Sequence, residues 1–169
     1  MRIKTLKIKN FRGYKEEVII DFANLTAFVG KNDVGKSTVL DALEIFFNDN
    51  KGIVKLEKGD VNKEASLSGD METILTVCFE EFPEKIIIDA TYETTLQSQY
   101  LLNSSGQLEI VKKYTNAGVA KVFVRAHHPT NPLCNDLLLK GDKDLRAIID
   151  RDNIPCPDKS TNAIMRTSI

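Results

Sequence analysis

Residues 30–37 read Gly30-Lys31-Asn32-Asp33-Val34-Gly35-Lys36-Ser37, a complete match to the pattern GxxxxGK[ST]. The two glycines let the backbone curl so that successive N–H groups point at one anion. The Lys36 ammonium can reach the β- and γ-phosphates of a nucleotide, and the Ser37 hydroxyl is a ligand that Mg²⁺ accepts. The pattern therefore predicts a loop that binds ATP with Mg²⁺.

The segments before and after this loop are of the kinds that flank a phosphate-binding loop, a strand and then a helix. An apolar run at 25–29 precedes it and is predicted to be a strand. After the loop, Leu40, Leu43 and Phe47 recur at helical spacing, with Val39 and Phe46 flanking the same stripe, which predicts an amphipathic helix over residues 36–47. The positive end of the helix dipole would lie at Lys36, where it favours an anion.

Most other elements are predicted to be strands. Ile3, Leu6 and Ile8 lie among lysines, which indicates a strand with an irregularity, and a second strand follows the turn signal Gly13-Tyr14. Residues 50–70 are polar and predict an exposed loop. Further strands are predicted at 73–80, 85–92, 107–114 and 119–125, then a helix at 142–151 and a polar tail.

These elements predict an α/β fold of the P-loop NTPase type, in which a central sheet carries the phosphate loop beside an antiparallel β layer. A length of 169 residues favours one domain. We expect strands, phosphate loop and first helix in 1–48, a β-rich lobe in 49–125, and a helical or irregular segment in 126–169. No breaker residue closes the final segment, so we expect this to be the N-terminal part of a larger polypeptide.

The composition is that of an ordinary globular protein, with 42% apolar and 28% charged residues. The net charge of −1 excludes a strongly basic nucleic-acid coat. No apolar run is long enough for a membrane span, and the N-terminus has no signal core, so we expect no membrane partner. The three widely spaced cysteines form no CxxC motif and fit a reducing, cytoplasmic location.

Three segments carry a resemblance to a known family: Asn10-Phe11-Arg12-Gly13-Tyr14, the run from Phe28 to Thr38, and Leu40-Asp41-Ala42-Leu43. They resemble the ABC-type ATPase heads of the SMC (structural maintenance of chromosomes), RecF and OLD (overcoming lysogenisation defect) nuclease families. In those heads the first strand ends in NFR or NFK, and GxNxxGKS precedes a helix that reads L-x-A-[IL]. The resemblance covers about the first 48 residues.

The resemblance implies that Asn32 contacts phosphate and that Arg12 lies against the nucleotide, although an ordinary surface arginine is the alternative. Lys31 and Asp33 depart from the usual pattern, but Lys31 is tolerable beside phosphate and Asp33 can point outward. Lys36 is the predicted catalytic residue, and Ser37 the predicted metal ligand. The nucleotide-binding residues predicted in all are Arg12, Gly30, Lys31, Asn32, Asp33, Val34, Gly35, Lys36, Ser37 and Thr38.

The resemblance also implies an ATPase head that acts on DNA, in repair or in defence against phage. In that class two heads close on ATP, which implies a homodimer or a larger assembly. Two alternatives stay open: an ATP-binding scaffold that recruits an effector protein without turnover, and the ATPase subunit of a membrane transporter. The NFR-like start argues against the transporter, as does the absence of the aromatic stacking residue that such subunits usually place before the loop.

Other motifs are weaker. Asp89 follows three isoleucines and is a candidate acid for Mg²⁺, but no Glu comes after it. Residues 66–70 imitate the signature loop of ABC-type heads, but they follow the phosphate loop too closely and lack its second Gly and its Gln. His127 and His128 have no partner at ligand spacing, so no zinc site is predicted.

The first fifteen residues hold six basic side chains and no acidic one: Arg2, Lys4, Lys7, Lys9, Arg12 and Lys15. On a two-residue period, Lys7 and Lys9 share a face opposite Leu6 and Ile8. That face would track a DNA backbone. The alternative is a solvated lysine face that protects a sheet edge.

We expect the isolated 169-residue chain to turn over little or no ATP, because the acid pair that hydrolysis requires is missing from its motifs. The check is a steady-state ATPase assay, in which kcat should stay far below about 1 per second. A chain that reaches that rate, and loses it on Asp89→Asn, would show that the Asp89 strand supplies the missing acid.

Overall fold

The computed structural model describes residues 1–30, 35–89, 92–129 and 131–169. The chain divides into two compact units. The first consists of Met1–Glu80 and Glu109–Val124, and the second of Glu81–Leu108 and Arg125–Ile169. The β-rich stretch 49–125 therefore contributes strands to both units.

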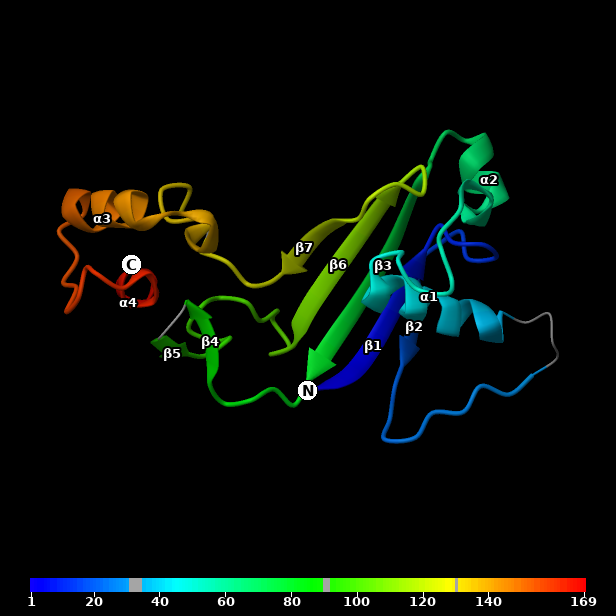
Figure 1. Ribbon diagram of the computed structural model, residues 1–169, viewed down its shortest axis with the longest axis horizontal. Helices are drawn as coiled ribbons and strands as arrows, with labels where there is room; N and C mark the ends of the chain where they lie inside the picture. Colours follow the sequence, from blue (N-terminus) through cyan, green and yellow to red (C-terminus); the bar gives the residue numbers. More distant parts are fainter. Residues whose placement is uncertain (31–34, 90–91, 130) are drawn as a thin grey trace. The chain divides into compact units, whose positions relative to one another are not determined.

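The first unit is built on a five-stranded sheet with the order β2-β1-β3-β6-β7 (Figure 1). Its strands are β1 (Arg2–Lys9), β2 (Val18–Asp21), β3 (Glu72–Glu80), β6 (Leu108–Thr115) and β7 (Lys121–Arg125). β1 pairs antiparallel with both β2 and β3, and Figure 1 shows the arrows of β3, β6 and β7 alternating in direction. The predicted antiparallel β layer is confirmed. So is the irregularity of the first strand, since the β1–β3 register shifts between Ile3 and Thr5.

Helix α1 (Lys36–Asn48) packs on one face of this sheet. On that face Leu6 is paired with Val77 and Ile8 with Leu75, and all four side chains are buried. The ring of Phe47 on α1 lies 6.1 Å from the ring of Phe79, measured between centroids, in an edge-to-face contact. Each buried aliphatic side chain contributes about 1.5–3 kcal/mol to the stability of this layer.

The predicted helix at 36–47 is confirmed and is one residue longer, and its apolar stripe was predicted correctly at the flanking Val39 and Phe46 but wrongly at Leu40 and Phe47. Leu40 is 58% exposed and Phe47 50% exposed. The buried row lies one position earlier in the sequence and consists of Val39, Ala42, Ile45 and Phe46. Both rows have helical spacing, so the sheet selected the buried row by packing against it.

Two other expectations for the first unit were wrong. Residues 25–29 are not a strand: no sheet neighbour pairs with them in the described chain, and Leu25 and Val29 are 88% and 93% exposed. Residues 50–70 are not simply an exposed loop, because they form the 3₁₀ turn η1 (Lys58–Asp60) and helix α2 (Lys63–Leu67) and bury Leu56 and Val61. The Asn62 side chain caps α2 by accepting hydrogen bonds from the N–H groups of Glu64 and Ala65.

The second unit holds a two-stranded sheet of β4 (Ile86–Asp89) and β5 (Tyr92–Thr94), the 3₁₀ turn η2 (Leu137–Leu139), and helices α3 (Asp142–Arg151) and α4 (Asn162–Ser168). α3 has the predicted bounds, whereas the predicted single strand at 85–92 is two strands. The predicted polar tail contains helix α4. This helix is held by Met165, which packs with Leu145 and Ile149 of α3 in a small core. Among the described residues, no helix has the length and apolarity that crossing a membrane requires.

The C-terminal end of α1 is bound by two side chains of β6. The buried Lys112 donates from Nζ to the Phe46 carbonyl oxygen at 2.8 Å and also pairs with the Asp49 carboxylate. That hydrogen bond holds the pKa of Asp49 below its ordinary value. The Tyr114 hydroxyl donates to the Ile45 carbonyl oxygen at 3.5 Å. A cation at this position complements the negative end of the helix dipole.

We predict that Tyr114 ionises only at high pH. Its burial, together with the charge of Asp49, raises the pKa of Tyr114 to about 12, compared with an ordinary value of about 10. Because the folded-state pKa is the higher one, the stabilisation is present below pH 10 and is lost as the pH rises toward 12. That loss is about 3 kcal/mol at most. The measurement is the ultraviolet absorbance of tyrosinate as a function of pH.

Tyr114→Phe should remove the ionisation step near pH 12, whereas the control Tyr100→Phe should keep that step. If the wild-type chain, still folded by circular dichroism, ionised all its tyrosines near pH 10, the burial of Tyr114 would be wrong.

Candidate functional site

The described part of the phosphate loop lies at the N-terminal end of α1. Gly35 precedes the helix, and Lys36 is its first residue. The Lys36 ammonium donates back to the carbonyl oxygen of Gly30 at 2.5 Å, so it lies between the two ends of the loop. Ser37 is exposed, while Thr38 is buried. The other predicted contacts, Lys31, Asn32, Asp33 and Val34, lie outside the described residues and stay predictions.

The first turn of α1, all of it described, contains no acidic side chain. The N–H groups that every helix leaves unpaired at this end, together with the helix dipole, therefore favour an anion. Gly35 has φ of +78°, a left-handed conformation that glycine adopts at little cost. A Cβ atom at Gly35 would also lie only 2.8 Å from the hydroxyl oxygen of Tyr14, so this position requires glycine on two grounds.

A tight turn after β1 brings Tyr14 to this point. Phe11 and Tyr14 exchange two backbone hydrogen bonds, each 2.9 Å long, and the Phe11 ring is buried. Arg12 has φ of +49°, which is uncommon for a residue other than glycine. Such backbone conformations persist only where surrounding contacts hold them.

The buried side chain of Asn10 provides the anchor for this turn. Its Nδ2 donates to the carbonyl oxygens of Asp70 at 3.0 Å and Glu72 at 3.2 Å, and its Oδ1 accepts from the N–H of Asn62 at 3.0 Å. The Asn10 carbonyl oxygen accepts from the Thr73 hydroxyl at 2.8 Å. One residue thus joins the end of β1 to the start of β3 and to the N-cap of α2.

Arg12 forms ion pairs with carboxylates from two other elements. Its Nε donates to Asp60 of η1 at 2.8 Å, and its Nη1 donates to Asp41 of α1. Partial burial lowers the pKa of Arg12, but the hydrogen bonds to Asp60 and Asp41 outweigh that effect and raise it above its ordinary value. The Asn62 side chain donates to the Arg12 carbonyl oxygen at 2.7 Å. Arg12 is therefore more than an ordinary surface arginine, while its contact with a nucleotide stays a prediction.

Sequence reasoning missed the partners that hold this site together. Asp41 lies in a segment that carries the family resemblance, but its ion pair with Arg12 was not predicted. Asp60 and Asn62 lie in a polar stretch with no periodic pattern, and nothing local indicates which residue they contact. Tyr14 carried a turn signal and lies in a segment of the family resemblance, but neither indicated its approach to Gly35.

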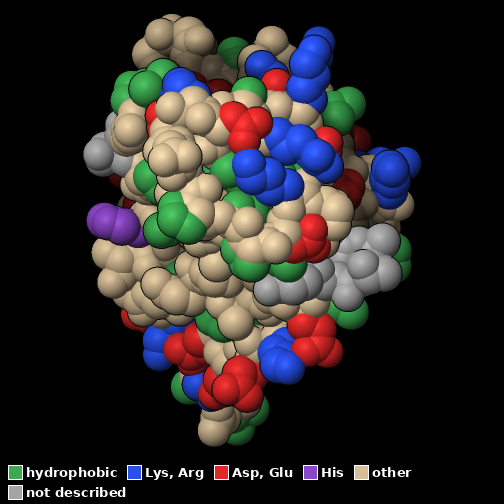
Figure 2. Space-filling model, turned by 90° about the vertical axis from the view of Figure 1, so that its left-hand side faces the viewer, with side chains coloured by type: hydrophobic (Ala, Val, Ile, Leu, Met, Phe, Trp, Pro, Cys, Tyr) green, Lys and Arg blue, Asp and Glu red, His purple; other side chains and the backbone are tan. Residues whose placement is uncertain are grey.

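The basic side chains of the first fifteen residues are largely ion-paired. Arg2 and Lys4 contact Glu80, Lys7 contacts the buried Glu109 at 2.9 Å, and Lys15 contacts Glu64. β1 lies between β2 and β3 in the sheet, so its lysines do not protect an edge, which was the alternative interpretation of this face. Figure 2 presents the left-hand side of Figure 1, the side of α3, and shows basic and acidic side chains intermixed there.

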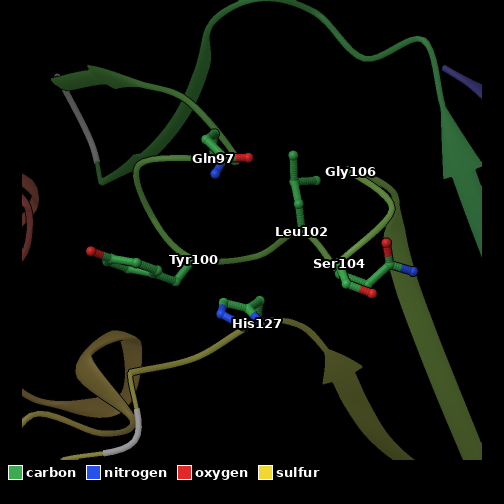
Figure 3. A pocket seen from close by; sticks show the side chains of 7 residues that line it. Gln97, Tyr100, Leu102, Ser104, Gly106 and His127 are labelled. Carbon is green, nitrogen blue, oxygen red and sulfur yellow. The ribbon is translucent and has the colours of Figure 1, made fainter.

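The second unit has a cavity of about 430 Å³ (Figure 3). It is lined by Gln97, Tyr100, Leu102, Asn103, Ser104, Gly106 and His127. The lining contains no lysine or arginine, so it lacks the cations that a polyphosphate requires. Among the described residues, no group of three His, Cys, Asp or Glu side chains is placed to hold a metal ion.

The mixed α/β fold and the loop at the N-terminus of α1 define a P-loop ATPase domain with an antiparallel β layer. The family model described as "AAA ATPase domain" matches residues 1–168. The chain therefore belongs to the AAA ATPase domain family.

Three curated relatives match a short segment of the chain. The "Structural maintenance of chromosomes protein 3 homolog" of Plasmodium falciparum is 44% identical over 50 residues, which are 29% of this chain and 4% of that protein. The "DNA replication and repair protein RecF" of Lactococcus lactis is 46% identical over 44 residues, 25% of this chain and 12% of that protein. An uncharacterized protein of Methanocaldococcus jannaschii is 38% identical over 50 residues, 30% of this chain and 23% of that protein. The matched segment is thus less than a quarter of each relative.

The fold as a whole resembles a solved structure described as "Structural biochemistry of ATP-driven dimerization and DNA stimulated activation of SMC ATPases". The TM-score is 0.50 at 15% identity, and the match covers 89% of this chain and 98% of that one. At this identity the likeness shows a shared fold. The predicted resemblance to SMC- and RecF-like ATPase heads is confirmed.

We predict that Asn10→Ala destabilises the chain by about 2–4 kcal/mol, because it removes three hydrogen bonds to part-buried backbone groups. Urea unfolding followed by circular dichroism measures this. The control Asn135→Ala, at an exposed position, should change stability by no more than about 0.5 kcal/mol. Equal effects of the two substitutions would show that Asn10 is not the anchor of the turn.

Proposed function

We propose that this chain is the ATP-binding portion of an SMC- or RecF-like ATPase head, with the nucleotide and Mg²⁺ held by residues 30–38 at the N-terminus of α1. The observation that carries the proposal is the position of Lys36. Its ammonium lies 2.5 Å from the carbonyl oxygen of Gly30, across the loop from its own backbone. A triphosphate held at the end of α1 would replace that single carbonyl with several charged oxygens as acceptors.

The described residues fit MgATP. The left-handed backbone of Gly35 leads into the N-terminus of α1, and no carboxylate in the first turn of that helix opposes an anion. The exposed Ser37 hydroxyl is the group that would ligate Mg²⁺, and Mg²⁺ would neutralise phosphate charge. Arg12, held by Asp41 and Asp60, is a second cation that would lie against the nucleotide.

For the complete protein we propose ATP hydrolysis by dimerised heads and an action on DNA, in repair or in defence against phage, in the cytoplasm. Support comes from the SMC and RecF relatives and from the similar solved structure, whose description names ATP-driven dimerization and DNA-stimulated activation for SMC ATPases. Lys4 and Lys7 of β1 are paired with Glu80 and Glu109 inside the unit, so we do not assign DNA binding to that strand.

Lys36→Ala should weaken MgATP binding to this chain at least about tenfold and should abolish ATP-dependent activity of the full-length protein. One hydrogen bond to a charged group contributes about 1.5–3 kcal/mol, and this ammonium can make more than one. The fold should be retained, because Lys36 is not part of the core. Isothermal titration calorimetry measures the affinity, and circular dichroism checks the fold.

Lys31→Ala is the matched control, since the motif does not require a lysine at that position. It should weaken binding far less. Equal losses from the two variants, or an unfolded Lys36→Ala protein, would show that the loop does not bind phosphate as proposed.

A further inference from the structure

The hydroxyl end of the Tyr14 side chain lies next to the phosphate loop. The atoms nearest to a Cβ placed at Gly35 would be the Tyr14 hydroxyl oxygen at 2.8 Å, then Cζ at 3.4 Å and Cε2 at 3.8 Å. The distances increase from the hydroxyl back into the ring, so the ring points at the loop and does not lay its face over it. The side chain is half-buried and belongs to the turn that Asn10 anchors.

The Tyr14 hydroxyl has no hydrogen-bond partner among the residues that the structure describes. The other tyrosine of this unit, Tyr114, donates its hydroxyl to a helix carbonyl. The Tyr14 hydroxyl therefore has the capacity to bond to a group from outside the chain. The segment next to it is the N-terminal end of α1, where the helix dipole attracts an anion and the first turn holds no carboxylate.

We propose that the Tyr14 hydroxyl donates a hydrogen bond to a phosphate oxygen of the nucleotide bound at Gly35 and Lys36. This contact rests on the proposed function and adds a residue to it. A phenol hydroxyl is a hydrogen-bond donor, and a bond that it makes to a charged oxygen is of the strong kind. Phosphate is favoured over the base because the hydroxyl oxygen is the Tyr14 atom nearest to Gly35, in the backbone that cradles phosphate.

The test compares Tyr14→Phe with the wild-type 169-residue chain, using MgATP and inorganic tripolyphosphate with Mg²⁺ as separate ligands in calorimetry. The substitution keeps the ring against Gly35 and removes only the hydroxyl. We expect Kd to rise about tenfold for both ligands, since one charge-assisted hydrogen bond is lost. The control Tyr100→Phe, an exposed residue of the second unit, should leave both Kd values unchanged.

The outcomes distinguish a failure of the proposed function from a failure of the Tyr14 contact. If the wild-type chain binds neither ligand, the proposed function itself is overturned. If it binds both and Tyr14→Phe binds them equally well, the phosphate contact is overturned and nucleotide binding stands. A loss confined to MgATP would assign Tyr14 to the nucleoside, and a lower melting temperature of Tyr14→Phe without ligand would assign the hydroxyl to stability. Either result contradicts the proposal.

Discussion

The buried amide of Asn10 holds the end of β1 at a point where three segments meet. It satisfies the carbonyl oxygens of Asp70 and Glu72 and the N–H of Asn62. Each of these groups would cost about 1–3 kcal/mol if it were buried without a partner, so the amide constrains all three segments at once. The turn that follows then delivers Arg12 to Asp41 and Asp60 and brings Tyr14 against Gly35. The surroundings of the phosphate loop therefore depend on one side chain whose own hydrogen bonds are made elsewhere.

Helix α1 is bound at one end and open to a ligand at the other. At its C-terminal end, Lys112 and Tyr114 satisfy carbonyl oxygens, and Asp49 balances the lysine charge. At its N-terminal end, no carboxylate within the first turn competes for the N–H groups, and the Lys36 ammonium adds positive charge. The dipole of a helix favours a cation at the first end and an anion at the second. Packing against β6 thus fixes α1 in the orientation that presents its anion-binding end.

The elements that were predicted well are those with a strong local pattern. Each has a hydrophobic period that extends over two or more helical turns or over a full strand, as in the helices at 36–47 and 142–151 and the strand at 73–80. The failures have identifiable causes. The run 25–29 has strand-like residues but no paired neighbour in the described chain, and a strand requires one. Residues 58–67 form short helical turns that are held by Asn62 and Asp60, side chains whose polarity alone suggested a loop.

The chemistry of residues 30–37, the period of α1 and the alternation of the strands are encoded over a few neighbouring residues, so the amino-acid sequence alone specified them. Tertiary packing selected which row of α1 faces the sheet, since rows one residue apart satisfy the same period. It also selected the partners of Arg12, which lie 29 and 48 residues further along the chain. Ion pairs and hydrogen bonds of that kind leave no local pattern, because each partner needs only to be polar. Only the folded chain brings the two partners together.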